Sequence, residues 1–228
     1  MSNSRIAVRM VMIDLDGTLI NTAPDLADSV NIMLERMGRD AWPLEKVSGW
    51  IGNGVSRLVK RALTDSFDAE PDSDDYEKGY ALFLQAYGEN VSAKSRPYDG
   101  VVSGLDKLKA AGYQLACVTN KAEAFTLPLL ADLNLDSYFE LVVSGDSLPR
   151  KKPDPLPLTH ACEHFGITPQ QGILIGDSAN DVKAAIAADM PVICVNYGYN
   201  QGVDLTTLDT QGVIDSLDTL DQHIELLS

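Results

Sequence analysis

The chain has 228 residues, enough for one large α/β domain carrying an insert or for two modest domains. It has 33 acidic and 18 basic residues, and no basic stripe offsets the net charge of -15, which argues against binding to nucleic acid or to an anionic membrane. Cys117, Cys162 and Cys194 lie scattered in apolar segments, as small core residues of a reducing compartment do. No apolar run approaches membrane-spanning length, so we expect a cytoplasmic protein, monomeric or homodimeric.

Short apolar runs rich in branched residues predict buried parallel strands. These runs are VMI at 11–13, QLACVT at 114–119, ELVVS at 140–144, GILIG at 172–176 and PVICV at 191–195. Between them, apolar residues recur at helical spacing around 101–108, 125–133 and 182–186. This alternation predicts an α/β fold with a doubly wound, Rossmann-like parallel sheet.

The connection after the first strand is unusually long, since roughly 75 residues precede the next helix of the sheet and an ordinary crossover needs far fewer. Apolar residues at helical spacing recur within it, around 26–37, 55–63 and 76–87. We therefore predict a core domain of residues 1–20 and 96–228, and a small helical cap domain of residues 21–95. Two linkers at one end would make the cap a lid.

Polar residues follow each predicted strand, where the carboxyl ends of parallel strands meet at one rim of a sheet. They are Asp14, Asp16, Thr18, Thr119, Asn120, Lys121, Arg150, Lys151, Lys152, Asp177, Asn180 and Asp181. Carboxylates such as Asp14, Asp177 and Asp181 are the oxygen ligands that Mg²⁺ prefers. An isolated DxDG is more often a capped turn, but the other strand ends favour a magnesium site here.

Two other kinds of site are excluded by their spacing. DLDGT and DSDDYEKG lack the further oxygens and late glutamate of an EF-hand. GNGV at 52–55 lacks the third glycine of a dinucleotide-binding loop, and GxxxxGK[ST] does not occur. We therefore expect Mg²⁺ as the cofactor and no nucleotide.

The motifs DLDGT, VTN, KKP and GDSAND together resemble those of the haloacid dehalogenase superfamily of phosphatases, over nearly the full chain. Within it, TAPDL, WIGNG, VTNK, KKPDP, GDSANDV and YGYN are most similar to the bacterial phosphoglycolate phosphatases. Asn21 stands where an acid is frequent in that family, and Ala122 where a proline is. The resemblance implies Mg²⁺-dependent hydrolysis of a small phosphomonoester, 2-phosphoglycolate, to glycolate and phosphate.

The resemblance also implies roles for the core motifs. Asp14 would be the nucleophile that forms an aspartyl-phosphate, and Asp16 the acid and base. The metal ligands would be Asp14, the backbone carbonyl of Asp16, Asp177 and Asp181. Thr119, the amide of Asn120 and Lys152 would hold the phosphate oxygens.

Each core residue also has an ordinary interpretation. Alone, Lys152 would be a solvated lysine, Thr119 a hydroxyl at a strand end, and Asp181 an acid favoured in the first turn of a helix. The co-occurrence of all four motifs favours the catalytic interpretation.

Specificity is expected to lie in the cap. Gly52, Asn53 and Gly54 form a turn whose amides can face an anion at a helix start, and Arg57 could meet a carboxylate. Packing of Trp50 within the cap and a solvated Arg57 are equally compatible with the pattern.

Three alternative functions remain. A phosphatase for sugar phosphates or a phosphoglucomutase would differ in the cap alone. A receiver-like phospho-acceptor module also uses aspartate, threonine, lysine and Mg²⁺, but it is about half this length and has no cap. An inactive scaffold would keep the fold, although the intact acids argue against it.

Overall fold

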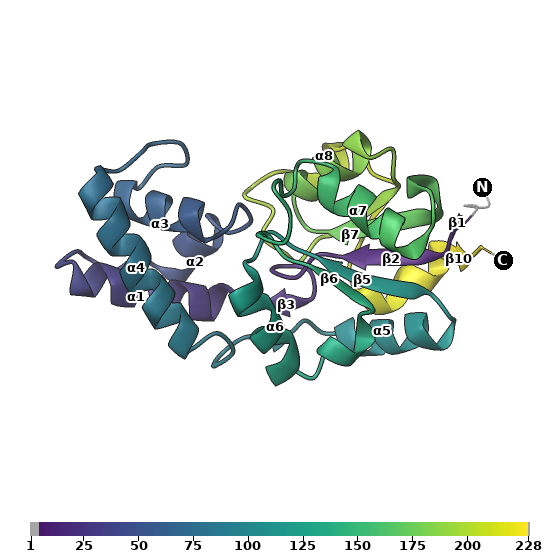
Figure 1. Cartoon of the computed structure of the whole chain (residues 1–228), viewed down its shortest axis with the longest axis horizontal. Coiled ribbons are helices and arrows are strands. Elements are labelled where there is room, and N and C mark those ends of the chain that lie inside the picture. The colour runs from purple at the N-terminus through teal and green to yellow at the C-terminus, as the bar shows by residue number, and fades with distance from the viewer. Residues whose placement is uncertain (1–4, 228) are drawn as a thin grey trace.

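A computed structural model describes residues 5–227, in which a parallel sheet carries the core of the fold. The sheet is six-stranded, in the order β6-β5-β2-β7-β8-β9, and each neighbouring pair is parallel. Its strands are β2 (Met10–Ile13), β5 (Gln114–Val118), β6 (Leu141–Val143), β7 (Gly172–Gly176), β8 (Val192–Val195) and β9 (Gly212–Ile214). With helices on both faces, this confirms the predicted doubly wound α/β fold (Figure 1).

Alternate residues of the central strands serve two separate hydrophobic clusters, as the two-residue period of a strand requires. Val11 and Ile13 of β2 belong to the cluster that includes helices α5 and α6. Met10 and Met12 belong to the cluster that includes α7 and α8. Because both faces of β2 are covered, its sequence is continuously apolar and not alternating.

The helices around the sheet are α5 (Val101–Ala110), α6 (Glu123–Asp132), α7 (Leu156–Phe165) and α8 (Ala179–Ala187). Short 3₁₀ segments lie at Asp136–Tyr138, Pro169–Gln171, Leu205–Thr207 and Leu217–Gln222. A separate parallel pair, β1 (Ile6–Val8) and β10 (Ile224–Leu226), joins the two ends of the described chain. Both ends of the described chain therefore lie at the end of the molecule farthest from the helices of residues 23–89 (Figure 1).

The five predicted strands and the predicted helical stretches are all present. The strands β1, β9 and β10 and the helix α7 were not predicted. The three cysteines are buried and unpaired, as expected. Between residues 5 and 227, every helix is too short or too polar to cross a bilayer.

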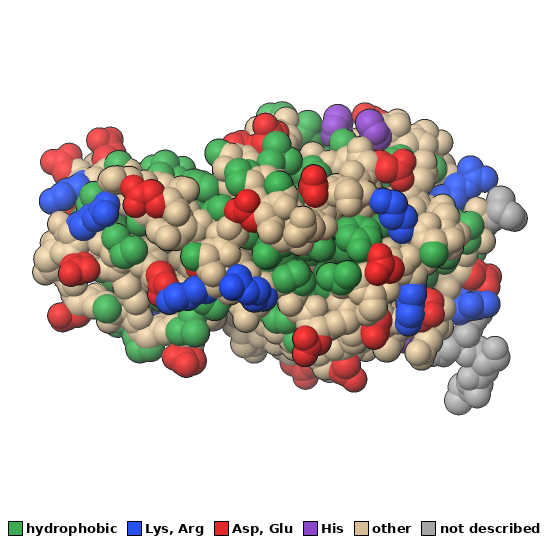
Figure 2. All heavy atoms as spheres, turned by 90° about the horizontal axis from the view of Figure 1, so that it is seen from below, with side chains coloured by type: hydrophobic (Ala, Val, Ile, Leu, Met, Phe, Trp, Pro, Cys, Tyr) green, Lys and Arg blue, Asp and Glu red, His purple; other side chains and the backbone are tan. Residues whose placement is uncertain are grey.

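The segment between β2 and α5 forms a second lobe of four helices (Figure 1). These are α1 (Ala23–Arg36), α2 (Leu44–Ser48), α3 (Val55–Thr64) and α4 (Ser73–Glu89). Their apolar faces bury Met33, Val59 and Phe83, while Trp42 and Trp50 meet edge to face with ring centroids 5.8 Å apart. The space-filling view shows two lobes joined by a narrower waist, with acidic and basic side chains interspersed on both (Figure 2).

Two chain segments connect the lobes and pair with each other. β3 (Ile20–Asn21) leaves the core and β4 (Arg96–Pro97) returns to it, as an antiparallel pair. The carboxylate of Asp25, at the start of α1, fastens this junction. It accepts hydrogen bonds from the backbone N–H of Lys94 at 2.9 Å, the N–H of Ser95 at 2.7 Å and the Ser95 hydroxyl at 2.6 Å. Asp25 and Ser95 are both buried, so these donors have no water to replace the carboxylate.

Replacing Asp25 by alanine is expected to destabilise the protein, because it leaves buried donors without an acceptor. The cost is about 2 kcal/mol, which corresponds to roughly 4–8 °C in the melting temperature of a chain of this size. Thermal unfolding followed by circular dichroism measures it. Asp28→Ala is the matched control, since Asp28 pairs with the exposed ammonium of Lys94 on the surface and its loss should change little. Equal melting temperatures for the two variants would contradict this role of Asp25.

Candidate active site

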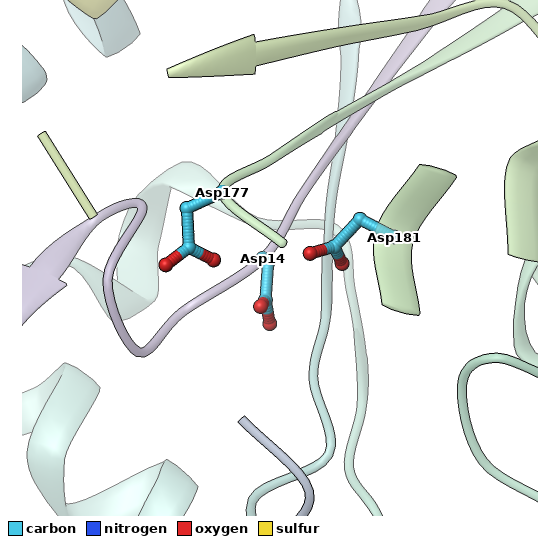
Figure 3. A group of neighbouring side chains, drawn as sticks. All are labelled: Asp14, Asp177 and Asp181. Atoms are coloured by element: carbon cyan, nitrogen blue, oxygen red, sulfur yellow. The ribbon is translucent and has the colours of Figure 1, made fainter. Parts of the chain in front are cut away.

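Three carboxylates converge at the carboxyl edge of the central strands. Asp14 follows β2, Asp177 follows β7, and Asp181 lies in the first turn of α8. One oxygen from each lies within 4.8 Å of the others, and Figure 3 shows Asp177 and Asp181 on either side of Asp14. β2 and β7 are hydrogen-bonded neighbours, with Ile13 opposite Ile175, so the residues that follow them emerge side by side. The predicted meeting of these three acids is therefore present.

Lys152, from the loop between β6 and α7, brings a buried cation to this cluster. Its Nζ lies 3.0 Å from Asp14 Oδ1 and 2.6 Å from Asp181 Oδ1, and it donates to the carbonyl of Val118 at 2.7 Å. Burial disfavours the ammonium, but the charges of Asp14 and Asp181 outweigh it and hold the pKa of Lys152 above the usual value for lysine. Lys152 is thus a fixed cation, but a single one against three acids.

Because one lysine does not balance three acids, the pKa values of two of these acids are raised. Burial, with a further contribution from Asp181 that partly offsets the stabilising charge of Lys152, raises the pKa of Asp14 to about 6. Burial and the charges of Asp181 and Asp14 raise the pKa of Asp177 well above its usual range. A divalent cation would supply the missing charge and restore ionisation. The oxygen-only donor set therefore fits a divalent metal, with Asp14, Asp177 and Asp181 as its ligands.

The backbone around the acids is shaped to let them approach. Gly17 has φ of +88°, and a Cβ there would lie 2.1 Å from Asp177 Oδ2. A Cβ at Gly176 would lie 2.3 Å from Asp181 Cγ. Both glycines of the DLDG and GD motifs are therefore required sterically, in addition to any role of the neighbouring acids.

Hydrogen bonds hold Asp177 and Asp181 in place. Asp181 Oδ2 accepts from the N–H and the hydroxyl of Ser178, which forms a capping box at the start of α8. Asp181 thus both caps its helix and faces the cluster. Asp177 accepts a short hydrogen bond from the N–H of Tyr199, and the Thr18 hydroxyl lies 3.4 Å from its other oxygen.

Asp16 points to a different partner from Asp14. Its two carboxylate oxygens lie 3.0 and 3.3 Å from Nζ of Lys121, which follows β5. Burial disfavours the Lys121 cation, but the Asp16 charge more than compensates and raises the pKa of this lysine. Asp14 and Asp16 are thereby neutralised by different lysines and line one pocket together.

Thr119 and Asn120 end β5 on the same pocket. The side-chain amide of Asn120 donates to the carbonyl of Lys152 at 2.9 Å and to the carbonyl of Gly52 at 3.2 Å. Asn120 therefore ties the lysine loop and the cap loop to the end of one strand. The predicted phosphate-binding residues Thr119, Asn120 and Lys152 lie around the acids.

The four cap residues that the sequence suggested for substrate specificity lie in different surroundings. Gly52 and Gly54 line the pocket opposite the acids. Asn53 turns its side-chain oxygen to Arg61, whose Nη2 lies 2.9 Å away, and to Gln201. Arg57 forms an exposed ion pair with Glu70 at 3.0 Å and is absent from the pocket lining.

Sequence reasoning gave no role to several residues that shape the site. Lys121 was recognised as a residue at a strand end and nothing more. Tyr199 of the YGYN motif holds Asp177, and Gln201 donates to the cap carbonyl of Ile51 at 2.6 Å. These contacts join residues 22 and 150 positions apart. In the sequence, the only sign of them was the match to the YGYN motif, which by itself indicated no chemical role.

Comparison with known proteins agrees with this geometry. The family model for haloacid dehalogenase-like hydrolases matches residues 11–195. A phosphoglycolate phosphatase of Thiobacillus denitrificans is 55% identical over 95% of this chain and 96% of its own length. One from Nitrosospira multiformis is 53% identical, over 93% of both chains.

A solved structure from Haemophilus somnus, described as a predicted phosphoglycolate phosphatase, superposes with a TM-score of 0.89. It is 35% identical, and the match covers 94% of this chain and 97% of that one. The residues that the family model matches include Asp14, Asp177 and Asp181. The chain belongs to the haloacid dehalogenase-like hydrolase family.

Proposed function

We propose that the protein hydrolyses 2-phosphoglycolate to glycolate and phosphate with Mg²⁺ as its cofactor. The observation that carries this proposal is the cluster of Asp14, Asp177, Asp181 and Lys152, in which Asp14 also lines a pocket beneath the cap lobe. The name shared by the relatives supports the choice of substrate. When bound, Mg²⁺ would neutralise the acids and the developing charge on the phosphoryl group.

Asp14 and Asp16 would divide the chemistry between them. An Asp14 carboxylate oxygen attacks phosphorus and forms an aspartyl-phosphate, while the bond to the glycolate oxygen breaks and that oxygen takes a proton from Asp16. Asp16 then removes a proton from water, which attacks phosphorus and releases phosphate from Asp14. Their different lysine partners support this division, because Asp14 pairs with Lys152 in the metal cluster whereas Asp16 pairs with Lys121 outside it.

Three groups would hold the non-bridging oxygens of the phosphate. The Thr119 hydroxyl, the backbone amide of Asn120 and the Lys152 ammonium would donate to the charge that spreads over the transferring group. Lys152 would serve twice, since it also orients the nucleophile. Helices α1 to α4, within the proposed cap domain of residues 21–95, would exclude bulk water as a lid.

The substrate assignment predicts a clear preference in a panel of phosphate esters. With Mg²⁺ present, kcat/KM should be highest for 2-phosphoglycolate among that ester, glucose 6-phosphate, fructose 6-phosphate and β-glucose 1-phosphate. Asp14→Asn is the control, because it removes the nucleophile with little change in shape and should lower turnover at least about 10³-fold. A preference for a hexose phosphate would overturn the assignment, and transfer of phosphate to a second sugar would indicate a mutase.

The raised pKa values predict how metal binding depends on pH. The folded protein retains protons on Asp14 and Asp177 that the unfolded chain releases near pH 4, so the stability from these carboxyls falls as pH rises above about 4. For Asp14, whose pKa is raised to about 6, this loss continues through about pH 6. Mg²⁺ replaces those protons. Saturating Mg²⁺ should therefore raise the melting temperature more at about pH 7.5 than at about pH 5, by roughly 5–10 °C at the higher pH.

Differential scanning fluorimetry with Mg²⁺ or EDTA at both pH values makes this measurement. Asp177→Asn should lose most of the Mg²⁺-dependent shift, because it removes one ligand while the pair of Lys152 with Asp14 remains. Asp189→Asn, at a carboxylate in the turn after α8 and outside the cluster, should keep the shift. An equal Mg²⁺ effect at both pH values, or a full effect in Asp177→Asn, would contradict the proposed metal site.

A further inference from the structure

We propose that Lys121 binds the carboxylate of the substrate and so selects phosphorylated hydroxy acids over esters without a second anionic group. This inference rests on the proposed function for the phosphate half of the site. It adds the residue that would recognise the rest of the substrate, a residue to which the sequence motifs gave no role.

Lys121 lies where the part of the substrate beyond the phosphate has to be. Its Nζ is 3.0 Å from Asp16 Oδ1, and Asp16 is the group proposed to give a proton to the ester oxygen. In 2-phosphoglycolate one methylene separates that oxygen from the carboxylate. A cation in contact with Asp16 is therefore within reach of the carboxylate, whereas Lys152 contacts Asp14 and Asp181 at the other end of the site.

Besides Lys121, the polar groups of the pocket wall for an anion are the uncharged ones of Thr119, Asn120 and the backbone of Gly52 and Gly54. Towards the cap the wall is formed by the apolar side chains of Leu26, Ile51, Val55 and Leu58. Among the lining residues that belong to the described part of the chain, Lys121 alone carries a positive charge. A carboxylate buried against the apolar side chains would lose its hydration without compensation, so it is directed to the ammonium.

Four other cationic side chains near the pocket already form ion pairs or hydrogen bonds with other groups. Arg57 and Lys60 both pair with Glu70, at 3.0 and 2.5 Å. Arg61 donates to the carbonyls of Trp50 and Phe67 and to the side chain of Asn53. Lys151 donates to the carbonyl of Asn53 at 3.1 Å. None of these four lines the pocket that holds Asp14 and Asp16.

The surroundings of Lys121 favour binding of an anion. The side chain is 2% exposed, so water does little to screen its charge. Nζ lies 4.7 Å from the ring centroid of Tyr87 in cap helix α4, an interaction that stabilises the cation without providing a carboxylate. The ammonium has three protons, and two suffice for both contacts to Asp16. The remaining N–H interacts with the Tyr87 hydroxyl, whose place the substrate carboxylate would take.

A pair of nearly isosteric substrates tests the inference. 2-Hydroxyethyl phosphate replaces the carboxylate of 2-phosphoglycolate by an alcohol and keeps the same ester oxygen. The purified protein with Mg²⁺ should prefer 2-phosphoglycolate, and Lys121→Gln should lower that preference, as a ratio of kcat/KM values, by about 10- to 150-fold. KM for 2-phosphoglycolate should rise. KM for 2-hydroxyethyl phosphate should change little, and any loss of kcat should be shared by both substrates.

Lys121→Arg keeps the charge and is expected to retain most of the preference, whereas Arg57→Gln is the matched control and should leave it unchanged. Circular dichroism establishes that each variant is folded, and if Lys121→Gln is not, the ratio for Lys121→Arg decides. An equal loss on both substrates in Lys121→Gln would mean that Lys121 only positions Asp16, and would overturn the inference. A preference for 2-hydroxyethyl phosphate in a folded Lys121→Arg would overturn it as well.

The same measurements separate this inference from the proposed function. If the unaltered protein does not hydrolyse 2-phosphoglycolate, the proposed function fails, and the inference fails with it. If the unaltered protein prefers 2-phosphoglycolate and Lys121→Gln keeps the full preference, the proposed function stands and the inference alone fails.

Discussion

The need to neutralise buried carboxylates governs this structure. Asp14, Asp177 and Asp181 gather at one edge of the sheet, where burial makes their negative charges costly and these like charges repel one another. Lys152 offsets part of this negative charge. The negative charge that remains makes the site suitable for a divalent metal. These three acids gather where strands β2 and β7 end side by side, and this places the proposed nucleophile, Asp14, at the metal site.

The remainder of the molecule supports this cluster and covers it. Gly17 and Gly176 allow the acids to approach, Ser178 and Tyr199 orient them, and Lys121 neutralises Asp16 separately. The cap lobe closes the pocket with apolar side chains, which strengthens every charge interaction inside. Asp25 fastens the two connections on which the cap is carried. A protein with a net charge of -15 can thus handle an anion, since screening over about 8 Å leaves the local cations in control.

The sequence predicted those features that depend on local patterns. The runs before Asp14 and Asp177 were recognised because a strand buried on both faces is continuously apolar, and strand ends in a parallel sheet meet by topology. β9 was missed because Gly212–Ile214 is short and ordinary in composition. The partners of Lys121 and Arg57 were also beyond prediction. Which acid a lysine or arginine meets depends on how a cap helix and a strand end pack, and Arg57 faces Glu70 within the cap where its residue type had suggested a ligand.

A crystal structure of the protein with Mg²⁺ and beryllium fluoride tests the central claim most directly, because beryllium fluoride imitates a phosphoryl group on a carboxylate. The account predicts beryllium bonded to a carboxylate oxygen of Asp14, with the metal contacting Asp14, Asp177 and Asp181 and with Lys152 beside the fluorides. Beryllium bonded to Asp16 or to any other side chain, or a metal bound away from these three acids, would contradict it.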